Sequence, residues 1–198
     1  MQKLIAGLAM FQARLFHAQR PLFERLARGQ APETLFITCS DSRIDPCLLT
    51  QTAPGELFIL RNAGNLIPSY GASDCGASAT IEYAVRALGV KDVIVCGHSH
   101  CGAMQAVLDP STLADLPAMA SWLGHAGAPA DGLQATVQAN VVAQLANLRT
   151  HPAVLTRLQR GDLRLHGWVY EFEHGTVQTY DPDDQSFRHL LPDLTAAG

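Results

Sequence analysis

The stretch DVIVCGHSHCG, residues 92–102, indicates the fold class of this chain. It begins with a short apolar run, Asp92–Cys96, which is typical of a buried strand, and continues into a polar segment bounded by glycines. Similar apolar runs occur at Thr34–Thr38, Glu56–Leu60 and Leu163–Tyr170, and helical periodicity covers Ser73–Leu88 and Thr136–Leu148. Continuously apolar strands that alternate with helices predict an α/β fold with a mainly parallel sheet.

Two further patterns complete the predicted architecture. Thr176–Tyr180 follows the turn His174-Gly175 and is typical of a hairpin partner for the preceding strand. The first thirty residues space their apolar side chains as one or two amphipathic helices do. We therefore predict four strands, one added hairpin strand and flanking helices.

Length, charge and hydropathy exclude several classes of protein. A chain of 198 residues is long enough for one domain with a sizeable core. Its net charge of −4 argues against general nucleic-acid binding and against a polybasic membrane contact. No apolar run in the sequence reaches the roughly 18 residues that a membrane span needs.

The start of the chain briefly resembles a signal peptide. Gln12, Arg14 and His17 interrupt its apolar run at helical spacing, which favours an amphipathic helix and a cytoplasmic protein. Without an export signal, five cysteines argue against a disulfide framework and favour metal ligands together with small buried residues.

Three residues at strand ends form a candidate metal site. Cys39 follows the first predicted strand, while His98 and Cys101 follow the third and are separated by two residues. The carboxyl ends of neighbouring parallel strands meet at one edge of a sheet, where ligands bind. Thiolate and imidazole suit zinc, and three protein ligands leave the fourth tetrahedral position open, as in catalytic sites.

Other interpretations of these residues remain open. Cys39 alone is compatible with an ordinary buried thiol, and His98 with a hydrogen-bonded core residue. A structural site would add Cys96 as a fourth ligand, although Cys96 belongs to an apolar run. His100 is a further possible ligand.

Asp41 and Arg43 follow Cys39 closely and are spaced to pair in an extended turn. The simpler interpretation is a loop ion pair or a helix cap ahead of Pro46. Beside a metal, an Asp held by Arg would stay ionised and orient a water molecule. Released from Arg, the same Asp would be able to ligate the metal and close the site.

The set Cys39-x-Asp41-x-Arg43 with His98-x-x-Cys101 resembles the β-class carbonic anhydrases. The resemblance spans about residues 20–180. Within the family, the sequence most resembles the bacterial, plant-like subgroup that includes the carbonic anhydrase of cyanate operons. The further segments that carry it are Pro54–Phe58, Arg61–Asn65, Pro68–Tyr70, Glu82–Ala84, Gly97–Met104, Gln144–Leu148, Thr150–Pro152 and His166–Trp168.

The resemblance implies one carbonic anhydrase domain over residues 1–198. Its fold would be a mainly parallel four-stranded sheet with an added antiparallel strand, and residues 1–30 would form a helical arm that wraps a partner subunit. It also implies a homodimer or larger homo-oligomer with active sites at the subunit interface. The partners would be carbon dioxide and bicarbonate, with no nucleic acid and no membrane.

The resemblance also assigns roles to single residues. Cys39, His98 and Cys101 would bind one Zn²⁺ per subunit, with Asp41 and Arg43 as the catalytic dyad. Zinc-bound hydroxide would attack carbon dioxide to give bicarbonate and a proton, reversibly. The implied substrate-binding residues are Gln30, Phe58, Ala63, Tyr83 and Gly102, with Gln30 indicating the constitutively open subtype and the aromatic lining supplied by the neighbouring subunit.

Two competing functions stay open at this point. The same ligands are compatible with hydrolysis of carbonyl sulfide or carbon disulfide. A non-catalytic structural-zinc module would instead require a fourth protein ligand. Asp74-Cys-Gly76 departs from the small residues that relatives often carry there, and neither Cys47 nor Cys75 receives a role.

Overall fold

The structure, a computed structural model, describes residues 1–72 and 75–191. Ser73 and Asp74, the first residues of the predicted Ser73–Leu88 helix, lie outside this described part. The contacts within the chain divide it into two compact units, Met1–Ala31 and Pro32–Gly198.

The N-terminal unit is a succession of helical segments. They are α1 (Gln2–Met10), η1 (Phe11–Leu15), α2 (Phe16–Ala18) and α3 (Arg20–Leu26). None of the residues in these four segments is buried, and Leu4, Ile5 and Leu8 expose more than half of their surface. The predicted N-terminal helices are therefore confirmed, with an apolar face that the unit itself does not cover.

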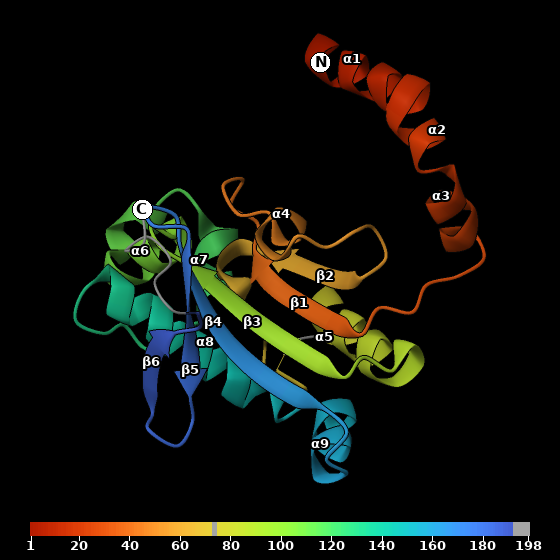
Figure 1. The fold of residues 1–198 in the computed structure, drawn as a ribbon. Coiled ribbons are helices and arrows are strands. Elements are labelled where there is room, and N and C mark those ends of the chain that lie inside the picture. The colour runs from red at the N-terminus through yellow and green to blue at the C-terminus, as the bar shows by residue number, and fades with distance from the viewer. Residues whose placement is uncertain (73–74, 192–198) are drawn as a thin grey trace. The chain divides into compact units, whose positions relative to one another are not determined.

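The second unit is built on a six-stranded sheet in the order β2-β1-β3-β4-β5-β6 (Figure 1). β2, β1, β3 and β4 run parallel, and β5 and β6 continue the sheet as antiparallel strands. The bounds are β1 (Thr34–Cys39), β2 (Leu57–Asn62), β3 (Asp92–His98), β4 (Arg164–Glu171), β5 (Thr176–Asp181) and β6 (Ser186–His189).

The parallel part of the sheet confirms the predicted α/β fold, and the antiparallel part is larger than expected. β5 is the predicted hairpin strand, whereas β6 is an additional strand that pairs Tyr180 with Phe187. Only Phe187 of β6 is partly buried, and so short a strand with three exposed residues gives little hydrophobic pattern to detect.

Alternate residues of each central strand pack on opposite faces of the sheet. Leu35 and Ile37 of β1 belong to a large core cluster that continues into the helices. Phe36, between them, joins Ile94 and Cys96 in a smaller cluster on the other face. Both faces are apolar, which explains why the strands appear in the sequence as unbroken apolar runs.

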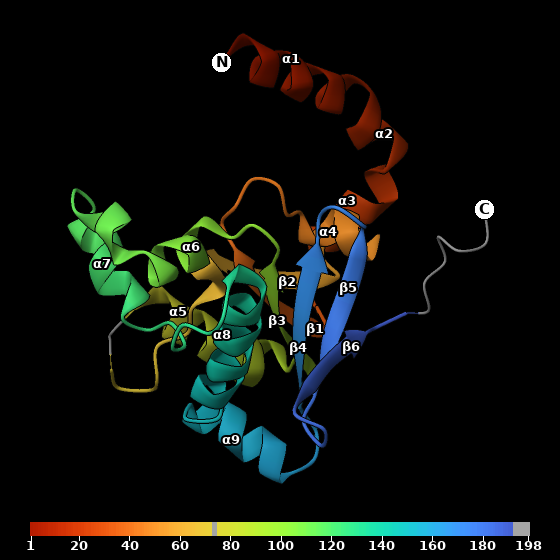
Figure 2. The ribbon, with the colours of Figure 1, turned by 90° about the vertical axis from the view of Figure 1, so that its left-hand side faces the viewer.

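The helix α8 (Leu133–Leu148) lies against the large-cluster face of the sheet (Figure 2). Gly97 of β3 and Gly167 of β4 allow this close approach. A Cβ atom built at Gly97 would lie 2.9 Å from Val137, and one at Gly167 would lie 2.9 Å from Val141. The two glycines are therefore required by packing.

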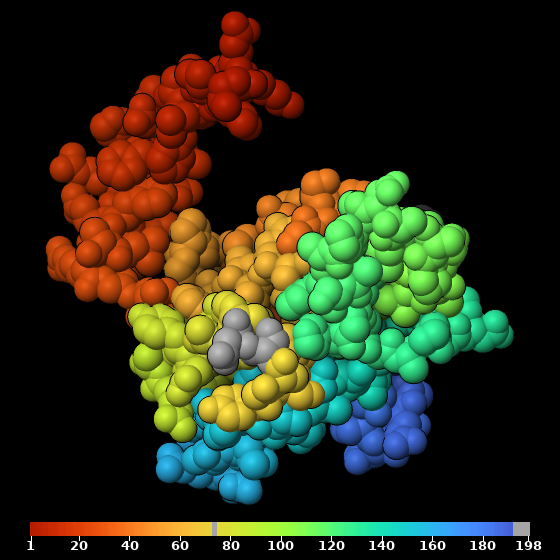
Figure 3. Space-filling view, turned by 180° about the vertical axis from the view of Figure 1, so that it is seen from behind, coloured from red at the N-terminus to blue at the C-terminus, as the bar shows by residue number. Residues whose placement is uncertain are grey.

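The other helices cover the same unit. They are α4 (Pro46–Thr50), η2 (Ala63–Asn65), α5 (Gly76–Glu82), η3 (Tyr83–Leu88), α6 (Gly102–Leu108), η4 (Pro110–Leu113), α7 (Pro117–Leu123) and α9 (Pro152–Gln159). Seen from behind, the α5–η3 segment in yellow-green lies beside α9 in light blue (Figure 3). Within residues 1–72 and 75–191, every helix is too short or too polar to cross a membrane.

Candidate metal centre

The carboxyl ends of β1 and β3 bring Cys39, His98 and Cys101 together. Cys39 is the last residue of β1, His98 is the last residue of β3, and Cys101 directly precedes α6. One ligand atom from each of the three side chains lies within 4.8 Å of the other two, and all three residues are buried. β1 and β3 are adjacent parallel strands, so the sheet itself closes the distance between residues that are far apart in sequence.

The His98 ring is oriented as a metal ligand. Its Nδ1 atom lies 2.7 Å from the carbonyl oxygen of Ser99, which accepts a hydrogen bond and so places the proton on Nδ1. Its Nε2 atom then carries a lone pair, and it is buried without a hydrogen-bond partner among the described residues. A buried polar atom without a partner is costly unless something binds it. A metal ion held by the trio would satisfy Nε2.

The setting of Cys39 favours its charged thiolate, whereas that of Cys101 favours the neutral thiol. The hydrogen bond from Cys101 and the backbone N–H of Gly64, 3.3 Å from Sγ, lower the pKa of Cys39. The hydrogen bond with Cys39, together with burial, raises the pKa of Cys101. Within the pair, Cys39 therefore ionises more readily than Cys101. A divalent cation would displace the protons of both thiols, and the set of two thiolates and one imidazole suits zinc.

Asp41 and Arg43 form a bidentate pair beside the trio. Arg43 donates from Nε to Oδ1 at 2.9 Å and from an NH2 nitrogen to Oδ2 at 2.7 Å. This guanidinium holds the pKa of Asp41 well below its usual range. Oδ2 of Asp41 lies 3.9 Å from Nε2 of His98. The carboxylate is thus ionised and near the metal position while it remains bound to Arg43.

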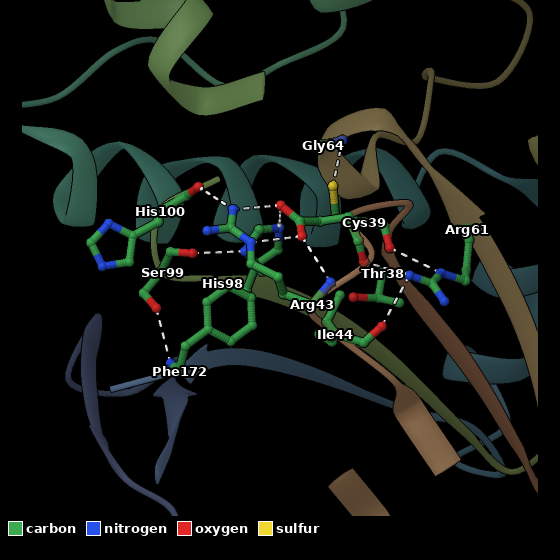
Figure 4. A network of polar contacts seen from close by, with 12 residues as sticks. Thr38, Cys39, Arg43, Ile44, Arg61, Gly64, His98, Ser99, His100 and Phe172 are labelled. Atoms are coloured by element: carbon green, nitrogen blue, oxygen red, sulfur yellow. Dashed lines mark hydrogen bonds and ion pairs between the residues drawn. The ribbon is translucent and has the colours of Figure 1, made fainter. Parts of the chain in front are cut away.

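Arg61 and Phe172 hold the loop that carries this pair (Figure 4). Arg61 donates to the carbonyl oxygens of Cys39 at 3.1 Å, Asp41 at 2.7 Å and Ile44 at 3.0 Å. The ring of Phe172 lies under the Arg43 guanidinium, with 5.0 Å between the ring centroid and Cζ. The loop after β1 is therefore fixed from both sides.

Comparisons with known proteins show the family to which this chain belongs. Residues 34–177 match the family profile described as "Carbonic anhydrase". A carbonic anhydrase of Pseudomonas aeruginosa is 49% identical over the whole of this chain and 96% of its own length. This chain belongs to the carbonic anhydrase family. Hydration of carbon dioxide is the reaction of that family, and zinc is its metal.

The solved structures place the chain in the β class of carbonic anhydrases. The β-carbonic anhydrase CcaA superposes with a TM-score of 0.92 at 45% identity and covers 96% of this chain and 92% of its own. A tetrameric β-carbonic anhydrase from Sordaria macrospora superposes with a TM-score of 0.74 at 28% identity, covering 90% and 95%. The fold predicted from the family resemblance is confirmed.

The alternative ligands in this carbonic anhydrase stay outside the trio. Cys96 is fully buried, and burial raises its pKa to about 12. The His100 side chain is exposed and pairs with Glu173. Within the described part of the chain, no fourth Cys, His, Asp or Glu joins Cys39, His98 and Cys101. A closed four-ligand site therefore has no support among these residues.

The predicted substrate-binding residues fall into two groups. Ala63 follows the end of β2, and Gly102 begins α6 next to Cys101, so both lie at the edge of the sheet that carries the metal trio. Phe58 and Tyr83 pair their rings at 5.9 Å, elsewhere on the unit. Gln30 belongs to the N-terminal unit, and its role stays a prediction.

The position of Phe58 is set by strand register. In the β1–β2 pair, Phe58 is opposite Leu35, whereas Asn62 is opposite Cys39. Four residues of strand place Phe58 about 13 Å from the ligand end of β2. Phe58 is therefore remote from the metal trio of its own chain.

The sequence analysis assigned no role at the metal site to several residues that surround the trio. Arg61, near the end of β2, and Gly64, just after it, lie beside the end of β1, and the predicted neighbouring parallel strands were a usable signal for both. Phe172 and Glu173 follow β4, whose Tyr170 pairs with His98, but the polar and aromatic segment there gave no metal-site pattern.

Proposed function

We propose that this chain interconverts carbon dioxide and bicarbonate at a zinc ion held by Cys39, His98 and Cys101. The observation that carries the proposal is the buried, unpartnered Nε2 atom of His98, which faces two cysteine sulfurs. Zinc bound there would act as a Lewis acid and lower the pKa of a water molecule from about 15.7 to about 7.

Asp41 orients the attacking water. Because Arg43 keeps the Asp41 carboxylate ionised, Oδ2 of Asp41 would accept a hydrogen bond from a water molecule at the metal and would orient it toward CO₂. Arg43 also prevents Asp41 from turning into the metal position. This pairing supports the open subtype that Gln30 indicates.

The proposal also gives roles to the residues that would bind bicarbonate and CO₂. The backbone amides that begin at Gly102 would donate to the oxygens of the forming bicarbonate, together with Gln30. Ala63 would contribute apolar surface at the same sheet edge. Phe58 and Tyr83 would line the CO₂ pocket of a neighbouring subunit, since Phe58 lies far from the trio of its own chain.

The chain would act as a cytoplasmic homodimer or homotetramer. We infer that residues 1–30 form an arm on the single carbonic anhydrase domain and cover a partner subunit. The exposed Leu4, Ile5 and Leu8 support this role, because an isolated helix with such a face has no core to stabilise it. Light scattering on the whole protein should give at least a dimer, and a monomeric enzyme with full activity would exclude completion of the site by a partner.

The metal ligands are tested by zinc content together with CO₂ hydration. Cys39→Ser should lose most bound zinc and most turnover, because a hydroxyl is a poor zinc ligand. Cys96→Ser is the matched control, since Cys96 is also buried and belongs to the neighbouring strand β3 but lies outside the trio. A Cys39→Ser protein with a full zinc complement and normal hydration would show that the ligand set is wrong.

The same assay separates the competing reactions. Rates on carbon dioxide, carbonyl sulfide and carbon disulfide can be compared on one zinc-loaded preparation. The proposal expects carbon dioxide to be the fastest of the three. A higher kcat/KM for either sulfur compound would assign the site to that substrate instead.

A further inference from the structure

The turn between β4 and β5 contacts the metal centre although it supplies no ligand. Phe172 begins this turn, and its ring lies 5.0 Å from the His98 ring, centroid to centroid. The same ring supports the Arg43 guanidinium. One residue of the turn therefore touches both a metal ligand and the residue that holds Asp41.

The next residue, Glu173, binds two consecutive side chains of the metal-binding loop. Its Oε2 atom accepts a hydrogen bond from the Ser99 hydroxyl at 2.8 Å. Its Oε1 atom pairs with Nε2 of His100. The backbone N–H of Phe172 adds a hydrogen bond to the Ser99 hydroxyl at 3.0 Å. Both carboxylate oxygens of Glu173 are thus used on residues 99 and 100.

The backbone carbonyls of these two residues are the ones that orient the site. The Ser99 carbonyl accepts from Nδ1 of His98 at 2.7 Å, and the His100 carbonyl accepts from Arg43 at 2.9 Å. His100 also has a left-handed φ of 54°, a conformation that costs a non-glycine residue energy and needs support from its surroundings. Figure 4 shows both carbonyl contacts on one side of the centre.

We propose that Glu173 is a positioning residue for the metal centre. By holding the Ser99 hydroxyl and the His100 ring, it fixes two successive carbonyls, one against the ligand His98 and the other against Arg43 of the dyad. The inference rests on the proposed zinc site and adds to it a residue of the β4–β5 turn that contacts the metal-binding loop.

A surface ion pair is the simpler explanation of Glu173, since its side chain and that of His100 are about half exposed. Such exposed pairs contribute little to the stability of a protein. Two observations are not explained by a surface ion pair alone. Ser99 is only 6% exposed, so its hydroxyl depends on Glu173 and Phe172 for partners. In addition, both residues that Glu173 binds present their carbonyls to the site.

The test compares Glu173→Ala and Glu173→Gln with Glu171→Ala. Glu171 is the matched control because it belongs to the same hairpin but binds Thr176 and Gln178. For each zinc-loaded protein, the rate of zinc transfer to a chromogenic chelator is measured at fixed pH. The visible absorption of the cobalt(II)-substituted protein reports the ligand geometry directly, and kcat and KM are determined in parallel.

Residues that orient a metal ligand typically contribute 10–100-fold to metal affinity or activity. We expect Glu173→Ala to release zinc about tenfold faster, to alter the cobalt spectrum and to lower kcat more than it changes KM. Glu173→Gln should recover part of this loss, because its amide oxygen still accepts from Ser99. Glu171→Ala should match the parent in zinc release and in the cobalt spectrum.

Two results would overturn the inference, and they are distinguishable. Zinc release and a cobalt spectrum unchanged in Glu173→Ala would remove Glu173 from the site and leave the zinc ligands in place. A parent protein that binds neither zinc nor cobalt would remove the proposed site and the positioning role with it.

Discussion

The backbone N–H of Gly64 donates a hydrogen bond to the Sγ atom of Cys39 across 3.3 Å. This contact joins the segment after β2 to the first candidate ligand. Gly64 has a left-handed φ of 77°, and its carbonyl accepts from the Asn140 side chain of α8 at 3.0 Å. The helix that packs on the sheet therefore also fixes a hydrogen bond to a metal-binding sulfur.

Gly64→Ala should weaken both the fold and the metal site. A left-handed φ costs an alanine about 1–2 kcal/mol, and its Cβ would lie 3.1 Å from that of Ala103. Gly89→Ala is the control, because Gly89 has a φ of 70° in open space. Denaturant unfolding should show a loss in both variants, and a chelator assay should show faster zinc release in Gly64→Ala alone. Equal zinc release would separate Gly64 from the site.

Asp41→Asn should retain zinc and lose most turnover. The amide keeps the size of the side chain but lacks the negative charge that orients the attacking water. Asp45→Asn changes a carboxylate in the same loop that instead caps α4 by accepting from the Leu48 N–H at 3.0 Å. That control should keep its activity, and its stability should change little because Asn also caps helices. Unchanged turnover in Asp41→Asn would remove Asp41 from the mechanism.

Gly97→Ala should destabilise the fold by about 1–3 kcal/mol, the usual range for overpacking. The added methyl group would lie 2.9 Å from Val137 and 3.0 Å from Val141, both on α8. Gly76→Ala adds the same methyl group in open space and should leave the free energy of unfolding unchanged. Denaturant unfolding measures the difference. Equal stabilities would mean that α8 can shift freely, contrary to this packing.

Asp92 should make the stability of the fold depend on acid pH. Arg164 and, to a smaller extent, His166 lower the pKa of Asp92 below its ordinary value of 3.8. A carboxyl group with a depressed folded-state pKa stabilises the fold above its ordinary pKa, and this stabilisation is lost as pH falls through the folded-state value. Asp92→Asn should therefore be up to about 1 kcal/mol less stable than the parent at neutral pH. The gap should close in acid, and a gap independent of pH would contradict the assignment.

The strands could be predicted because apolar runs are a local signal, and the metal trio because neighbouring parallel strands end at the same edge of a sheet. Apolar runs marked β1, β3 and β4 to within one or two residues, and the parallel arrangement then brought Cys39 and His98 to one sheet edge. Predicted Glu56–Leu60 appears as Leu57–Asn62, because the pairing with β1 continues to Asn62 opposite Cys39.

The surroundings of the trio could not be predicted in the same way. Asn140 and Gln144 are buried on α8, where polar side chains break the apolar pattern. They bind the segment after β2, with Asn140 on Gly64 and Gln144 on the Ile67 N–H at 2.7 Å. Such contacts depend on tertiary packing between residues more than 70 positions apart, for which a single sequence carries no local signal.

The most direct test of the proposed activity is a zinc titration of the metal-free protein, followed by stopped-flow CO₂ hydration. The account predicts that activity rises linearly with zinc and stops at one ion per chain, and that Cys39→Ser stays inactive at the same zinc additions. Full hydration activity in the metal-free protein, or none after one zinc per chain has bound, would contradict it.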